Sequence, residues 1–294
     1  MCTVSFIPRK NGYLLAMNRD EKLTRPAGLP PKSRKVDGCA VLCPSETGGG
    51  TWIALNDTGA TLALINWYSV TAGVNQDAIS RGEVVKAASA AGGKTDVGSA
   101  LAKLPLAKIN PFRLIGVFPV MGGIFEWRWD LKKLVCITHP WKSQQWISSG
   151  FDERKAQRIR GAAFRLALAQ SSAGSLGWLR RLHRSHAPEC GPFSTCMHRR
   201  DAATVSCTEI EYTPRHATMR HHRGAPCRAR KHSIRRLRLQ TVDGKCQASG
   251  LLLASGTVIK RAGFNRRTSP FRGASLIRRG SGERLTPQEL EICR

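Results

Sequence analysis

The sequence predicts a domain of mixed helices and strands, and three observations support that class. Apolar runs of strand length alternate with longer helical stretches in the order strands, helix, strands, helix, strands. Turn dipeptides such as Asn11-Gly12 divide the strands into hairpins. The 294 residues are 41% hydrophobic and 23% charged, which is enough chain and apolar content to bury a core without disulfides. We therefore expect an α+β fold.

Two hairpins are expected in the first part of the chain. Residues 3–7 and 13–17 are β-rich runs on either side of the first turn. Residues 51–55 and 61–66 are a second pair of apolar runs, joined by a polar turn that ends in glycine. Residues 24–50 lie between the hairpins and contain four prolines and five glycines without a helical or strand period. They are expected to form a loop.

Helices and strands alternate in the remainder. Residues 77–91 repeat their apolar side chains near helical spacing, and residues 151–170 are rich in the helix formers Ala, Arg and Leu. Residues 112–120, 123–138 and 193–219 have the character of strands. We therefore expect the fold to contain layers of helices and layers of strands.

The charge is strongly basic and unevenly placed. Lys and Arg number 47 against 20 Asp and Glu, a formal net charge of +27, and residues 228–294 are the most basic part. We therefore divide the chain into a domain, residues 1–227, and a basic divergent tail, residues 228–294. The tail is interpreted as disordered, as a nucleic-acid arm, or as an out-of-frame continuation of the coding sequence. Nucleic acid is the least favoured partner, because only Phe264 and Phe271 offer stacking surfaces among the arginines.

Compartment and membrane association follow from what the sequence lacks. No eighteen consecutive residues are apolar, which argues against a membrane-spanning helix. The first ten residues show no basic start followed by a long apolar run, so no secretory signal is expected. These features predict a cytoplasmic protein whose ten cysteines are mostly reduced. Oligomeric state is not predicted.

Cys2 is the first candidate catalytic residue. A small second residue allows the initiator methionine to be removed, which leaves a thiol and an α-amine on one residue. The amine has an ordinary pKa of about 7.7 to 8, so near neutral pH part of it can act as the general base for the thiol. One residue then supplies both nucleophile and base.

Several linked motifs give the chain a specific resemblance over roughly residues 1–227. They are, in order, Met1-Cys2, Leu15-Ala16-Met17-Asn18-Arg19-Asp20-Glu21, Arg25-Pro26, Gly49-Gly50-Thr51-Trp52, Leu64-Ile65-Asn66, Ser80-Arg81-Gly82-Glu83, Asn110-Pro111-Phe112 and Trp146-Ile147-Ser148-Ser149-Gly150. By these motifs the chain resembles the NRDE family, also called the transport and Golgi organisation 2 family. That family is in turn similar to the cysteine-type N-terminal nucleophile hydrolases.

The resemblance implies a fold and a set of roles. The fold is a four-layer αββα sandwich of the N-terminal nucleophile hydrolase type. Cys2 matches the nucleophile, Asp20 matches an aspartate that contacts the α-amine, and Asn66 matches an asparagine of the oxyanion hole. Removing an amide N–H that is directed at the oxyanion costs roughly 3 to 4 kcal/mol of transition-state stabilisation. Cys2, Asp20 and Asn66 are thus the predicted catalytic residues.

Three further residues are predicted to bind. Asn18 and Arg19 belong to the same motif as Asp20, and Arg19 reaches the face of Cys2 if its strand is regular. Trp67 follows Asn66 and is placed to line a substrate cleft. Each of these residues also has a plain structural interpretation, as a strand-end ion pair or as part of the core.

A local cluster of imidazoles and thiols is the candidate for a metal site, because these groups suit Zn²⁺. The cluster consists of His183, His186, Cys190, Cys196 and His198. Its spacing matches no standard zinc motif, and Pro188 and Pro192 interrupt it. No metal and no cofactor are therefore predicted.

Two functions are carried forward from the sequence. The first is an amidohydrolase that cleaves a non-peptide C–N amide of a small-molecule substrate through Cys2. The second is a non-catalytic carrier or chaperone of a small hydrophobic ligand, haem or a lipid, on the same fold.

Overall fold

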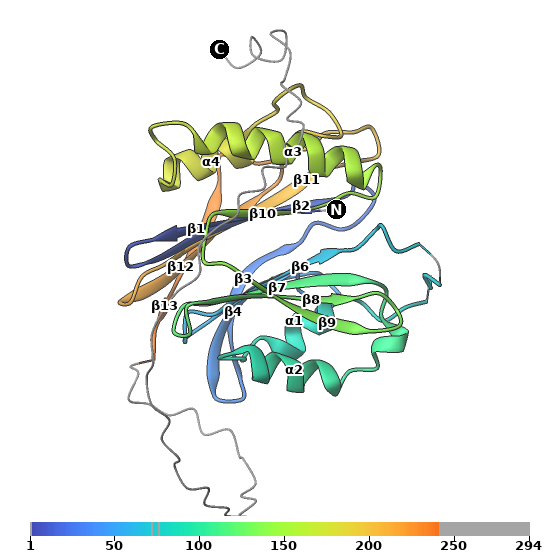
Figure 1. Ribbon diagram of the computed structural model, residues 1–294, viewed down its shortest axis with the longest axis vertical. Coiled ribbons are helices and arrows are strands. Elements are labelled where there is room, and N and C mark those ends of the chain that lie inside the picture. The colour runs from blue at the N-terminus through green and yellow to red at the C-terminus, as the bar shows by residue number, and fades with distance from the viewer. Residues whose placement is uncertain (1, 72, 76, 241–294) are drawn as a thin grey trace, which may run out of the picture. The chain divides into compact units, whose positions relative to one another are not determined.

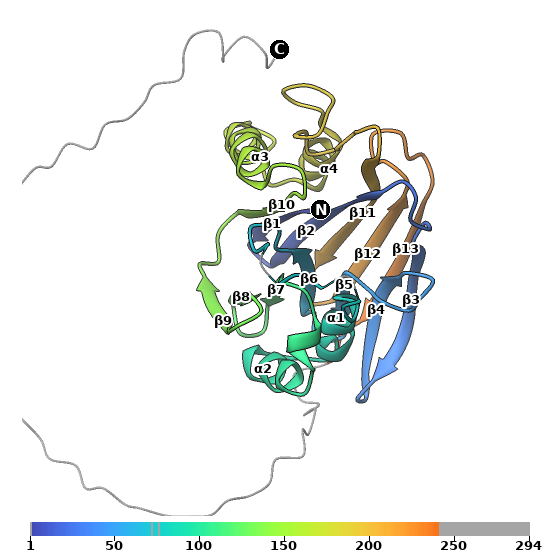
Figure 2. The same cartoon turned by 90° about the vertical axis from the view of Figure 1, so that its right-hand side faces the viewer.

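Two antiparallel sheets lie face to face with helices on their outer faces in the computed structural model, which describes residues 2–71, 73–75 and 77–240 (Figure 1). Helices α3 (Glu153–Leu168) and α4 (Leu176–Arg184) cover the outer face of the first sheet, and α1 (Gly82–Ala88) and α2 (Lys94–Ala102) cover that of the second (Figure 2). The α+β sandwich predicted from the sequence is confirmed.

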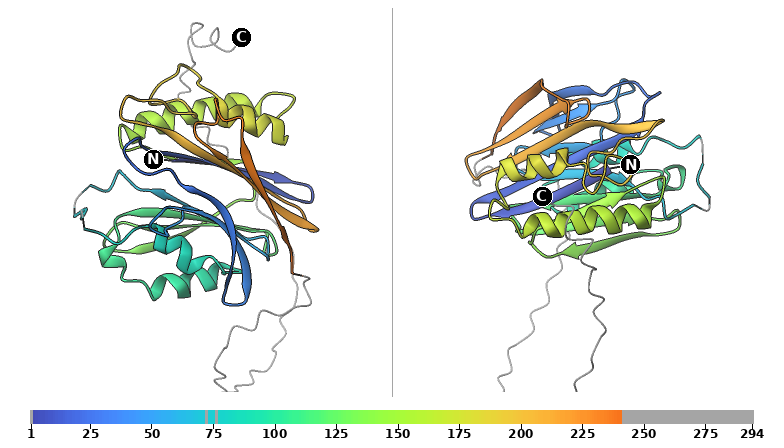
Figure 3. Two further views of the ribbon diagram at one scale, coloured as in Figure 1. Left: turned by 180° about the vertical axis from the view of Figure 1, so that it is seen from behind. Right: turned by 90° about the horizontal axis from the view of Figure 1, so that it is seen from above.

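The two sheets are built from separate stretches of chain. The first has the order β10-β1-β2-β11-β12-β13 and consists of β10 (Gln144–Ser148), β1 (Cys2–Arg9), β2 (Gly12–Lys22), β11 (Ala202–Tyr212), β12 (His216–Arg223) and β13 (His232–Arg238). The second runs in chain order and consists of β3 (Leu29–Val36), β4 (Cys39–Ser45), β5 (Ile53–Asn56), β6 (Thr61–Asn66), β7 (Phe112–Phe118), β8 (Gly123–Trp129) and β9 (Leu134–His139). Figure 3 shows the two sheets in views from behind and from above.

Alternation along the strands divides the core into three parts. On β2, Tyr13, Leu15 and Met17 join the cluster between the sheets, whereas Leu14 and Ala16 pack under α3 and α4. A third cluster lies between the second sheet and helices α1 and α2. Successive residues of one strand therefore pack into different core clusters. Neighbouring residues of a motif on that strand lie on opposite faces of the sheet.

The prediction of a loop over residues 24–50 is wrong for most of that stretch. Strands β3 and β4 form a hairpin there, and Asp37 and Gly38 turn it with positive φ angles of 48° and 82°. Two prolines of β3 are tolerated because β3 is the edge of its sheet and its register shifts between Leu29 and Lys32.

The helix predictions are confirmed in part. Helix α3 occupies most of the predicted range 151–170, with Asp152 as the N-cap that accepts from the Lys155 N–H. The predicted helix over 77–91 is shorter in the structure, where α1 begins at Gly82. Helices α2 and α4 were not predicted. In α2 only Val97 and Leu101 are buried, so its sequence shows little helical periodicity.

The later strands are mostly where the sequence placed them. The stretch 123–138 forms the strands β8 and β9 on either side of a turn at Asp130-Leu131-Lys132-Lys133, as its sequence predicts, and Asp130 accepts two backbone N–H groups there. The stretch 193–219 contains β11 and the start of β12. Strand β10 was not predicted, although it forms the partner of β1.

The sheet continues beyond residue 227, where the sequence predicts the end of the domain. Strand β13 pairs with β12 along its whole length and extends the first sheet. The other part of the predicted tail, residues 241–294, lies outside the described residues. The interpretations of that part as disordered, nucleic-acid-binding or out of frame therefore stay predictions.

The helices of the described ranges are all too short or too polar to span a membrane. Not one of them has the length and apolarity needed to cross a bilayer.

Candidate functional site

Cys2 is the first residue of β1 and lies on the face between the two sheets. It pairs with Arg19 of β2 on one side and with Ser148 of β10 on the other. The residue is 7% exposed and belongs to the core cluster between the sheets. Burial raises the pKa of the Cys2 thiol, while the charge of Arg19 opposes that shift. Cys2 therefore lies across from the end of β2, the strand that carries the predicted aspartate.

The Asp20 carboxylate is buried on the opposite face of the sheet, toward α3. One oxygen lies 3.1 Å from Arg160 Nη1, and the other accepts a 2.6 Å hydrogen bond from Thr204 Oγ1. Arg160 Nη1 also donates to Thr3 Oγ1 at 2.7 Å. Because Asp20 and Arg160 are both fully buried, this pair fixes the first residues of β1 against the end of β2.

Arg19 lies beside Cys2 on the inner face, as a regular strand predicts. Its guanidinium pairs with Glu21 at 3.3 Å and with Glu46, and it stacks on the Trp52 ring at 4.6 Å. Arg25 bridges the same two carboxylates at 2.9 Å each. The network holds Arg19 in place and balances its charge beside the thiol.

Asn66 is the last residue of β6 in the facing sheet. Its Nδ2 donates to the Tyr68 hydroxyl at 2.8 Å. The Tyr68 ring packs so closely on Gly150 that a Cβ there would meet ring carbons at about 3.0 Å. Gly150 follows β10, whose Ser148 pairs with Cys2, and Ile65 shares the buried cluster of Cys2. Asn66 is thus linked through Tyr68 to the end of β10, the strand that pairs with β1.

Several buried polar atoms around Cys2 lack a protein partner. Among the described residues, this holds for Ser148 Oγ opposite Cys2 and for Ser206 Oγ opposite Arg19. It also holds for Trp52 Nε1 and for Nε2 of His221, whose ring lies 6.3 Å from that of Trp52. Buried polar atoms are nearly always satisfied, so this inner face has unused capacity for water or for a polar ligand.

Asn18 points away from Cys2, toward α4. Its Nδ2 donates to the carbonyls of His183 and Thr195, at 2.9 and 2.8 Å, and its Oδ1 lies 3.0 Å from His183 Nδ1. Burial lowers the pKa of His183 to about 4, so the ring is neutral at pH 7. It donates from Nδ1 to Asn18 and accepts at Nε2 from Ser5 Oγ at 3.0 Å. Asn18 therefore fastens a loop to the sheet.

Replacing Asn18 with alanine is expected to destabilise the fold by about 1–3 kcal/mol, because buried carbonyls and an imidazole lose their partners. Urea unfolding of the variant measures this loss. The matched control is Asn75→Ala, an exposed loop residue. An unfolding midpoint equal to that of the parent protein would contradict the fastening role of Asn18.

Trp67 lines a cavity of about 620 Å³ beside β10. Arg128 lies over its ring at 5.9 Å, and Arg113 donates to the Ile147 carbonyl at 3.4 Å. Ile147 lies in the wall of this cavity and directly precedes Ser148. The cavity wall therefore includes the residue that precedes Ser148 on β10.

A buried carboxylate holds these arginines. Glu126 is fully buried and bonds to Arg113, to Arg128 at 2.9 and 3.0 Å, and to His139 at 2.8 Å. Burial alone would raise the pKa of Glu126, but the hydrogen bonds and charges of Arg128 and Arg113 outweigh it and lower the pKa to about 2.

Sequence reasoning missed the partners of the predicted residues. Arg160 and Thr204 lie 140 and 184 residues from Asp20 along the chain, and Ser148 is as remote from Cys2. The predicted imidazole and thiol cluster is divided: His183 bonds to Asn18 and Ser5, and Cys190 is exposed. His186, Cys196 and His198 do converge, and Cys227 joins them. No local spacing signal points to Cys227.

The N-terminal part of the chain, a little less than half of it, matches a family model. The family model described as Transport and Golgi organisation 2 matches residues 1–138. No curated protein sequence matches the chain.

Solved structures that resemble this chain include an acylase and a hydrolase. Penicillin V acylase from Agrobacterium tumefaciens is 11% identical with a TM-score of 0.45, and the match covers 76% of this chain and 83% of that one. The C2A mutant of the conjugated bile acid hydrolase from Clostridium perfringens is 12% identical with a TM-score of 0.48, over 83% and 94%.

The family match spans β1 to β9, and thus includes Cys2, Asp20 and Asn66. All three predicted catalytic residues therefore lie within the matched segment. Residues 1–138 of the chain match the model of the Transport and Golgi organisation 2 family.

Proposed function

We propose that this protein is an amidohydrolase of the N-terminal nucleophile type, which cleaves a non-peptide C–N amide through Cys2. The observation that carries the proposal is the placement of Cys2 at the first position of β1, paired with Arg19 of β2 and with Ser148 of β10. Removal of Met1 would expose an α-amine on the same residue, next to a buried carboxylate.

The reaction divides into two steps. The α-amine takes the thiol proton, and the Cys2 sulfur attacks the amide carbonyl carbon. The C–N bond breaks as the ammonium returns a proton to the leaving amine, and a thioester remains. The α-amine then takes a proton from water, the hydroxide attacks the thioester carbonyl, and the C–S bond breaks to release a carboxylic acid and the Cys2 thiol.

Each predicted residue has a role in this scheme. Asp20, held by Arg160 and Thr204, orients the α-ammonium of Cys2. Asn66 has two N–H donors, one of which is bonded to Tyr68, so the other is available to a tetrahedral oxyanion. Tyr68 positions that amide.

The cavity beside β10 suggests the kind of substrate. Its lining mixes the arginines Arg113 and Arg128 with the ring of Trp67 and several glutamines and serines. Guanidinium groups recognise carboxylates, so the cavity favours an amide that carries an anionic group. A purely apolar ligand, as the carrier interpretation requires, would cover the glutamine and serine side chains of the lining without offering them a hydrogen bond.

The test of the proposal is the chemical state of the N-terminus. Intact mass and the N-terminal peptide of the purified full chain are expected to show that Met1 has been removed. The α-amine freed by removal of Met1 is expected to activate the adjacent thiol, so that a limiting dose of iodoacetamide at pH 7 modifies Cys2 ahead of the exposed Cys190. Retention of Met1, or modification of Cys190 before Cys2, would overturn the mechanism.

A further inference from the structure

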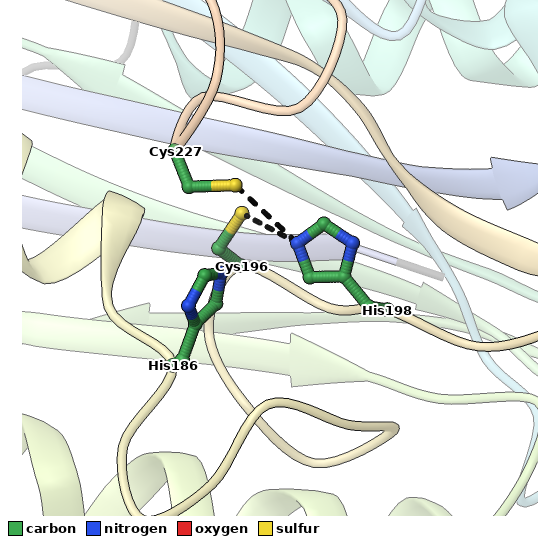
Figure 4. Close-up of side chains that lie close together, drawn as sticks. All are labelled: His186, Cys196, His198 and Cys227. Atoms are coloured by element: carbon green, nitrogen blue, oxygen red, sulfur yellow. Dashed lines mark hydrogen bonds between the residues drawn. The ribbon is translucent and has the colours of Figure 1, made fainter.

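Four side chains that bind transition metals converge outside the proposed catalytic site. They are His186, Cys196, His198 and Cys227, and each offers one ligand atom within 4.8 Å of the others. Figure 4 shows them pointing toward a common centre. Two thiols and two imidazoles are the ligand set of a structural zinc site.

The distances within the cluster are those of neighbouring ligands around one ion. His198 Nε2 lies 3.6 Å from Cys196 Sγ and 3.4 Å from Cys227 Sγ. A tetrahedral ion with Zn–S of about 2.3 Å and Zn–N of about 2.0–2.1 Å separates its ligands by roughly 3.3–3.8 Å. The widest pair therefore needs to close by only about 1 Å.

His186 gives independent support for a bound ion, because one of its ring nitrogens lacks a hydrogen-bond partner in the described part of the chain. His186 Nε2 is buried and has no hydrogen-bond partner among the described residues. Its ring lies 5.0 Å from that of His198 at 72°. A buried ring nitrogen without a partner is uncommon, and a metal ion bound within the cluster would satisfy it.

The backbone around the ligands is already ordered. His186 follows α4, Cys196 and His198 lie in the loop before β11, and Cys227 lies between β12 and β13. The Cys196 N–H donates to the Ser185 carbonyl at 2.9 Å, and the His198 N–H donates to Gly191 at 3.1 Å. Three separate connections are thus brought to one point.

We propose that His186, Cys196, His198 and Cys227 bind one Zn²⁺ ion in a closed, structural site. Two thiols release their protons to solvent on binding, and both imidazoles bind as neutral rings. Two thiolates balance the charge of the ion, so the site has no net charge. With four protein ligands there is no open position for substrate, and the role of the ion is to tie the three connections together.

The site also reaches Asp20 through the loop that it fastens. The N–H of Met197, between two of the ligands, donates to Thr204 Oγ1 at 2.8 Å, and Thr204 donates to Asp20. Carbonyls of Pro192 and Phe193 in the same loop accept from Arg160 at 3.3 Å each. This link to catalysis rests on the proposed function, whereas zinc binding does not.

The decisive measurement is the zinc content of the full chain, determined by elemental mass spectrometry. The protein is purified without chelator from zinc-supplemented medium. About one zinc per chain is expected for the parent protein. Cys196→Ser and Cys227→Ser are expected to lower the zinc content about tenfold or more. Cys190→Ser is the matched control, because Cys190 lies in the same loop but is exposed, and it is expected to keep its zinc.

A second measurement needs no variant and so does not depend on whether the variants fold. Replacement of zinc by Co²⁺ in the parent protein is expected to give the intense visible bands of a tetrahedral site and a thiolate-to-cobalt charge-transfer band. The proposal is overturned by a parent protein without zinc, by unchanged zinc in Cys227→Ser, by a Cys196–Cys227 disulfide, or by an octahedral cobalt spectrum. None of these readouts involves amide hydrolysis, so failure of the catalytic proposal would leave them unaffected.

Discussion

Replacing Cys2 with alanine is expected to lower amide hydrolysis by about 10⁴-fold or more, because the proposed reaction passes through a covalent bond to this sulfur. The loss should appear in kcat, since the cavity that binds the substrate is left intact. Cys2→Ser tests the chemistry further. A hydroxyl is far less acidic than a thiol, so serine is expected to restore little of the activity.

The measurement uses a panel of N-acylglycines with short, medium and long acyl chains, each of which carries a carboxylate for the cavity arginines. Cys136→Ser is the matched control, because Cys136 is part-buried in β9 and packs against the core cluster under α1 and α2, not the cluster of Cys2. Circular dichroism and unfolding midpoints establish that the variants fold. Full activity in folded Cys2→Ala would rule out Cys2 as nucleophile, and unchanged binding of a hydrophobic ligand without any turnover would favour the carrier.

Replacing Glu126 with glutamine is expected to destabilise the fold by about 3 kcal/mol at pH 7. The carboxylate is fully buried and faces Arg113, Arg128 and His139. Glutamine fills the same space but leaves the guanidinium groups without a counter-charge.

The pH dependence of this effect has a definite sign. The folded pKa of Glu126 is about 2, below its ordinary value of 4.5, because the contacts with Arg128 and Arg113 outweigh burial. A carboxyl whose pKa is lowered on folding stabilises the protein fully above its unfolded pKa. Its contribution is lost as the pH falls from 4.5 through 2. The stability gap between the parent and Glu126→Gln is therefore expected to close over that range.

Urea unfolding at a series of pH values measures the gap. Glu83→Gln is the control, because Glu83 forms an exposed ion pair with Lys86 at 3.3 Å and is expected to change stability by less than about 0.5 kcal/mol. A gap that stays constant down to about pH 2 would show that the ionised carboxylate is not the source of the stability.

The N-terminal part of the fold and the centre of the candidate site could be predicted from local patterns. The first hairpin follows from two β-rich runs around Asn11-Gly12, and its register sets Cys2 opposite Arg19. Helix α3 follows from composition over sixteen residues. These features depend on residues that are close in the sequence, so a single chain is enough to read them.

Asn18 shows where local reading is insufficient. It lies in the same motif as Arg19 and Asp20, but the alternation of β2 directs it to α4, where it bonds to His183 and Thr195. Arg19 points to the space between the sheets, beside Cys2. A motif indicates which residues occur together, and only the packing of both faces of the sheet shows which of them meet.

The sequence by itself determined the α+β class, the first hairpin, and the position of Cys2 at the start of a strand. The tertiary structure alone decided that Arg160 holds Asp20 and that Cys227 joins His186, Cys196 and His198. Turns and strand periods depend on a few neighbouring residues, so a short stretch of sequence is enough to predict them. Contacts between residues that are tens to more than a hundred positions apart are set by sheet order and helix packing, which bring together groups with no common pattern in the chain.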